Sequence, residues 1–79
     1  MDIPDNLSAI ATIIQKDWKI VNSSAVPYLQ AMHAIRSIED HYGAVSGRAV
    51  VVYFLGNART WRGDTAKAVK AKLNHLLKS

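Results

Sequence analysis

The first part of the chain carries one apolar stripe at helical spacing. Its apolar side chains recur every three or four positions, at Ile3, Leu7, Ile10, Ile14, Trp18 and Val21. Positions three and four apart share one face of an α-helix. Asp2 suits an N-cap, and Pro4 is tolerated in a first turn because the amide there has no helical partner. The pattern predicts a helix over residues 4–20, followed by a polar break at residues 22–24.

A second helical pattern begins at Pro27. Proline fixes a helical φ and disfavours helix at the residue before it, so Pro27 suits the first position of a helix. Tyr28, Met32 and Ile35 then lie on one face. Gly43 is the expected left-handed terminator. The pattern predicts a helix over residues 27–40 and a short link into the next segment.

The longest apolar run, residues 49–55, shows no alternation of apolar and polar positions. Such a run is a buried strand or a buried helix, and its valines and aromatic residues favour a strand by propensity. A helix is preferred because a lone strand would leave its backbone groups unpaired, and the sequence contains no second strand-like run. Ser46 suits an N-cap, and Gly56 with Asn57 ends the run. We expect a central helix over residues 46–58, apolar on nearly every side, with a strand as the alternative.

The last pattern is amphipathic and basic. Its apolar face consists of Ala66, Val69, Leu73, Leu76 and Leu77. Its polar face consists of Lys67, Lys70, Asn74 and Lys78. This pattern predicts a helix over residues 64–78. The four segments together predict an all-α fold, a compact four-helix domain that includes residues 1–79 and surrounds a buried third helix.

Length and composition narrow the class of protein. Seventy-nine residues make one small domain, and an apolar fraction of 49% favours a folded chain over a disordered one. The chain has no cysteine, which excludes disulfides and thiolate metal sites. It contains neither the roughly 20 consecutive apolar residues of a membrane span nor a basic segment leading an apolar one. We therefore expect a cytoplasmic protein with no membrane partner.

The net charge of +4 is distributed unevenly. Residues 48–79 contain seven basic residues against Asp64 alone, a net charge of +6, whereas residues 1–47 carry −2. A basic half of this kind is typical of proteins that bind nucleic acid or acidic proteins. The alternative is a solvated helix face that keeps a small domain soluble.

No arrangement of residues predicts catalysis or metal binding. His33, His41 and His75 lie on different segments and form no pair at metal-ligand spacing. Ser46, His41 and Asp40 show no spacing typical of a nucleophile turn. We expect no catalytic residue, no metal and no cofactor, and hence no enzyme.

The most distinctive hexapeptide is R-T-W-R-G-D, residues 59–64. Arg59 and Arg62 beside an exposed Trp61 would suit a phosphate backbone with base stacking. The alternative is that Trp61 packs in the core while the arginines bond carbonyls at the end of the central helix. A helix-turn-helix is disfavoured because the link over residues 57–63 exceeds the usual three- or four-residue turn. Any nucleic-acid binding is therefore expected to have low sequence specificity.

Several motifs occur in a familiar order. They are D-W-K (17–19), A-V-P-Y-L-Q-A-M (25–32), H-Y-G (41–43), S-G-R (46–48) and Y-F-L-G-N-A-R-T-W-R-G-D-T-A (53–66). This set resembles a family of small, mostly uncharacterised proteins encoded by bacteriophages, prophages and mobile elements. The resemblance implies a cytoplasmic accessory protein of an infected or lysogenic bacterial host. Such proteins often bind a host or phage macromolecule, including defence complexes.

These observations together predict a small non-enzymatic binding protein whose partner is a host or phage protein. Aromatic and arginine residues are the usual composition of an interface hot spot. The predicted binding surface consists of Arg59, Trp61, Arg62, Lys67, Lys70 and Lys78. Nucleic-acid binding through the same surface is the alternative. Self-association is a further expectation, since a partner subunit would complete the core of so small a domain.

Overall fold

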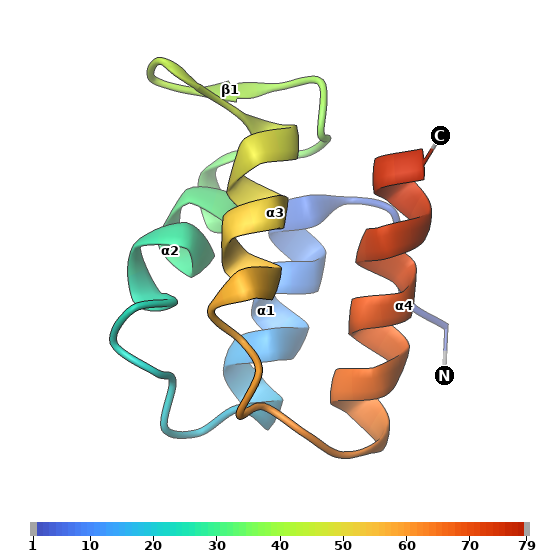
Figure 1. Cartoon of the computed structure of the whole chain (residues 1–79). Coiled ribbons are helices and arrows are strands. Elements are labelled where there is room, and N and C mark those ends of the chain that lie inside the picture. The colour runs from blue at the N-terminus through green and yellow to red at the C-terminus, as the bar shows by residue number, and fades with distance from the viewer. Residues whose placement is uncertain (1, 79) are drawn as a thin grey trace.

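The computed structural model describes residues 2–78, which form four α-helices and one two-stranded antiparallel sheet (Figure 1). The elements are α1 (Leu7–Asp17), α2 (Val26–Ala34), β1 (His41–Tyr42), β2 (Val45–Ser46), α3 (Gly47–Gly56) and α4 (Asp64–Lys78). Figure 1 shows α1 behind α3, with α2 and α4 on either side. The Cα radius of gyration is 11.1 Å, close to the roughly 12 Å expected for a compact domain of this length. The chain is thus compact and mostly helical.

One hydrophobic core joins all four helices. The apolar stripe of the first segment is confirmed, because Leu7, Ile10 and Ile14 are fully buried. The other large side chains that are fully buried are Met32, Val50, Val51, Phe54, Val69 and Leu73. Every helix therefore contributes its apolar face to the same cluster.

The first helix is shorter than the predicted range 4–20. Asn6, and not Asp2, is its N-cap: the Asn6 side chain accepts a hydrogen bond from the Ala9 amide at 3.2 Å. The Leu7 amide donates to the Arg36 carbonyl at 2.9 Å, so a tertiary contact satisfies a donor at the helix start. Pro4 precedes the helix. The helix ends at Asp17, because the next residue leaves the helical region at ψ 89°.

The second helix ends at Ala34, six residues before the predicted boundary at residue 40. Its successor Ile35 is extended, with φ −125° and ψ 163°. The Asp40 carboxylate accepts hydrogen bonds from the amides of Arg36 at 2.9 Å and Ser37 at 3.2 Å. These two bonds lower the pKa of Asp40 below its ordinary value. An aspartate that binds nearby amides stabilises a turn in place of helix, which explains the early end.

A hairpin follows where a plain link was expected. His41 pairs with Ser46 and Tyr42 with Val45, leaving Gly43 and Ala44 as a two-residue loop. Gly43 has a φ of 63°, while Ala44 does not have a positive φ. A positive φ at the first loop residue alone is the pattern of a type II′ hairpin turn. The left-handed Gly43 was correctly predicted, but its role as a helix terminator was wrong, and the all-α expectation holds only in part.

The apolar run of the chain forms helix α3, so the strand alternative is wrong. Ser46 is the N-cap, as predicted, and its hydroxyl accepts from the Ala49 amide at 3.1 Å. The helix ends at Gly56, two residues before the predicted boundary. Its expected burial on nearly every side is wrong, because Val52 is 48% exposed and Tyr53 51%. α3 contacts α2, α4 and the hairpin, which leaves one face open to solvent. The predicted range of α4, residues 64–78, is confirmed.

Two neighbouring valines test this one-sided burial. We expect Val51→Ala to lower the free energy of unfolding by roughly 1.5–3 kcal/mol, since Val51 is fully buried. Val52→Ala should change it by no more than about 0.5 kcal/mol, because this side chain is half exposed. Urea unfolding followed by circular dichroism measures both values. Equal losses would contradict the exposed face of α3.

Candidate macromolecule-binding surface

Trp61 lies in the core. Its side chain is 3% exposed and stacks on Trp18, with ring centroids 5.7 Å apart and planes inclined by 9°. Phe54 meets it edge-on at 6.4 Å and 68°. The indole Nε1 donates to the Asp17 carboxylate at 2.8 Å. Trp61 therefore ties the α3–α4 loop to the end of α1, and its ring is not available to stack on a base.

The loop between α3 and α4 is ordered by hydrogen bonds within the protein. The Trp61 amide donates to the Ala58 carbonyl at 3.1 Å, and Ala58 itself is buried. At the end of α3 the Asn57 side chain donates to the Tyr53 carbonyl at 2.8 Å. The sequence predicted that arginines bond the carbonyls at the end of α3. Among residues 2–78, the side chain that bonds the Tyr53 carbonyl is Asn57. Arg59 and Arg62 are instead exposed to solvent.

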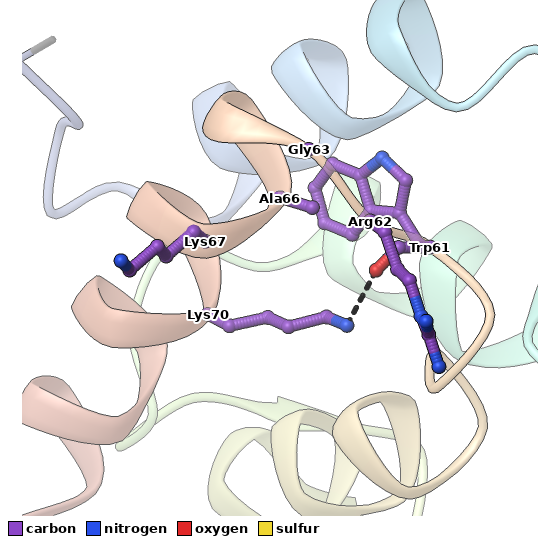
Figure 2. Close-up of a pocket in the computed structure, with 6 residues that line it drawn as sticks. All are labelled: Trp61, Arg62, Gly63, Ala66, Lys67 and Lys70. Carbon is purple, nitrogen blue, oxygen red and sulfur yellow. Dashed lines mark hydrogen bonds between the residues drawn. The ribbon is translucent and has the colours of Figure 1, made fainter.

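Arg62, Lys67 and Lys70 surround a shallow, open pocket of about 330 Å³ (Figure 2). Its other lining residues are Trp61, Gly63 and Ala66. Three cationic residues thus line the place where the loop enters α4, with the Lys67 ammonium directed away from the other two in Figure 2. Among the described residues, none that lines the pocket carries a carboxylate. Such a pocket attracts anions.

Lys70 is the most constrained of these cations. Its Nζ donates to the Trp61 carbonyl at 2.6 Å and lies 5.9 Å from the centroid of the indole ring. Burial, and then the charge of Arg62, lower the pKa of Lys70. A contact with a carbonyl nine residues earlier fixes the side chain along the pocket wall, as Figure 2 shows.

The predicted surface residues divide into two groups. The first group, which lines the pocket, consists of Trp61, Arg62, Lys67 and Lys70. Arg59 does not line it, and Lys78 lies at the far end of α4, about 12 Å along the helix axis from Lys70. Sequence reasoning missed Gly63 and Ala66, which lack bulky side chains and leave the pocket open. Ala66 precedes Lys70 by one helical turn, a spacing that could have indicated its place.

Other basic residues of the C-terminal half are engaged elsewhere. Lys72 forms a salt bridge with Asp5, and its hydrogen bond and charge lower the pKa of Asp5. Arg48 donates to the Leu77 carbonyl at 2.5 Å and so caps the end of α4. Among residues 2–78, the contact between Lys72 and Asp5 is the only salt bridge. The pocket cations therefore have no carboxylate partner within the described chain.

Residues 2–78 contain no metal site, no membrane-spanning helix and no helix pair of the helix-turn-helix type. These residues contain no group of three or more histidine, aspartate or glutamate side chains placed to hold a metal. None of their helices is long and apolar enough to cross a membrane. α3 and α4 contact each other and run in roughly opposite directions (Figure 1). A DNA-binding helix-turn-helix instead sets its two helices at a steep angle, so this pair does not match it.

Comparisons with protein-family models, with curated proteins and with solved structures each found no match to this chain. The resemblance to phage-encoded proteins stays a prediction from the motifs.

Proposed function

We propose that this chain is a non-enzymatic binding protein that docks on an acidic surface of another protein. The setting is the one that the motifs imply, a phage or prophage accessory factor that contacts a host or phage protein, including a defence complex. The observation that carries the proposal is the pocket of Arg62, Lys67 and Lys70, which no carboxylate lines. A concentrated and unpaired positive charge favours a negatively charged partner.

The burial of Trp61 supports a protein target over a nucleic acid. Proteins that bind single strands stack bases on exposed aromatic rings, and the ring nearest to these cations is inside the core. Without it, the surface offers only charge to a phosphate backbone. Nucleic-acid binding of low sequence specificity is the alternative, and its contacts would be purely electrostatic.

Fluorescence anisotropy with labelled probes separates the two targets. The probes are a short glutamate-rich peptide, its glutamine counterpart, and single- and double-stranded oligonucleotides. Each is titrated at about 50 and about 200 mM salt, a range over which nucleic-acid affinity falls steeply. We expect the glutamate peptide to bind more tightly than the oligonucleotides and the glutamine peptide not to bind. Tighter binding of an oligonucleotide at both salt concentrations would contradict the proposal.

A charge reversal locates the surface. Lys67→Glu should weaken the glutamate peptide about tenfold, because it places a like charge at the pocket. Lys19→Glu is the matched control: it makes the same change of net charge at an exposed position that does not line the pocket. Circular dichroism should show unchanged helicity in both variants. Equal losses of affinity would mean that net charge alone attracts the peptide.

A further inference from the structure

Lys70 differs from the other cations of the pocket because its position is already fixed. An ammonium group has three donors, and the Trp61 carbonyl occupies one of them at 2.6 Å. The two remaining donors are free to bind an incoming acceptor. Lys67 and Arg62 are exposed, so a partner would have to immobilise them and would lose binding free energy to side-chain entropy. Lys70 is already held by its hydrogen bond, so it loses less entropy on binding.

Small residues and two further cations line the pocket around the Lys70 side chain. Trp61, Gly63 and Ala66 line the pocket beside the Lys70 stem. In Figure 2, Arg62 lies near the ammonium end of Lys70, whereas Lys67 points away from it. A group that fits has a short apolar stem and ends in an oxyanion, which the ammonium can bind by a charge-assisted hydrogen bond.

We infer that Lys70 is the anchor of the binding surface and receives the carboxylate of a glutamate side chain of the partner protein. The methylene groups of that glutamate would lie along Gly63 and the Lys70 stem, while Arg62 and Lys67 attract the acidic surface around it. This inference rests on the proposed function and deepens it. The lowered pKa of Lys70 agrees with it, because a bound carboxylate offsets both burial and the charge of Arg62.

Three glutamine variants test the anchor with the glutamate-rich peptide. Lys70→Gln keeps an N–H donor on a side chain that is one bond shorter and loses the charge, and it should weaken binding about tenfold through faster dissociation. Lys67→Gln should weaken it less, mainly by slowing association, as expected for a charge at the rim. Lys19→Gln, outside the pocket, should stay within about twofold of the wild type.

Nuclear magnetic resonance supplies a readout at the pocket itself. Saturation with the peptide should shift the backbone amide resonance of Arg62, which shares a peptide group with the Trp61 carbonyl that Lys70 binds, in the wild type and leave it nearly unchanged in Lys70→Gln. An unshifted Arg62 amide resonance in the saturated wild type would overturn the anchor. So would an equal loss of peptide affinity in Lys70→Gln and Lys67→Gln. The proposed function would survive that result if Lys67→Glu still weakened the peptide.

The remaining outcomes are also decisive. If the wild type does not bind the glutamate-rich peptide at all, the proposed function fails and the anchor fails with it. If oligonucleotides bind more tightly and with the same dependence on Lys70, the anchor receives a phosphate, and the carboxylate assignment is overturned.

Discussion

Replacing Trp61 by alanine should lower the free energy of unfolding by roughly 3–5 kcal/mol, the range for removing a large buried aromatic side chain. The substitution removes the stack on Trp18 and the edge contact with Phe54. It also removes the indole donor of the Asp17 carboxylate, and so the link between the α3–α4 loop and α1. A loss of this size is a large fraction of the stability of a small domain.

The measurement is urea unfolding followed by circular dichroism, since the substitution removes a fluorophore. Tyr42→Ala is the control, because this aromatic residue of the hairpin is 48% exposed. It should cost less than about 1 kcal/mol. Similar losses in the two variants would contradict a core position for Trp61. A small loss in Trp61→Ala combined with lost peptide binding would make it a contact residue.

Gly47→Ala should destabilise the protein by roughly 1–3 kcal/mol, although it replaces a poor helix former with the best one. A Cβ at Gly47 would lie 2.5 Å from the Ser37 carbonyl oxygen and 3.0 Å from the Ile38 Cα. Both atoms belong to the backbone, so no flexible side chain can move aside. The Gly47 amide also donates to the Asp40 carbonyl at 2.6 Å, which fixes the close approach.

The matched control for this substitution is Gly56→Ala. Gly56 is the last residue of α3, and a Cβ there would meet no atom within 4 Å. Alanine should therefore be neutral or stabilising at this position, by up to about 1 kcal/mol. Thermal unfolding of both variants compares the signs directly. A stabilising Gly47→Ala would show that the backbone of residues 37–40 does not pack against Gly47, the first residue of α3.

The helices with regular apolar spacing could be predicted from the sequence. The stripe from Leu7 to Trp18 is buried, and the bounds of α4 agree with its amphipathic pattern. The hairpin could not be predicted, because each of its strands has two residues and no alternation develops over such a length. The early end of α2 depends on Asp40, whose hydrogen bonds to earlier amides form only when the chain turns back.

The candidate site was predictable in composition but not in geometry. Its basic residues and Trp61 stand out in the sequence, whereas the burial of Trp61 depends on contacts with Trp18 and Phe54, which are distant along the chain. The constraint on Lys70 depends on the path of the α3–α4 loop, which brings the Trp61 carbonyl to its ammonium. Periodicity carries no information about such a path.

A titration of the isotope-labelled wild-type protein with the glutamate-rich peptide, followed by two-dimensional nuclear magnetic resonance, tests the proposed binding surface most directly. We expect the shifted backbone resonances to cluster at Trp61, Arg62, Lys67 and Lys70, which line the pocket. Shifts that cluster instead on the exposed face of α3, at Val52 and Tyr53, would contradict it, as would an unchanged spectrum at high peptide concentration.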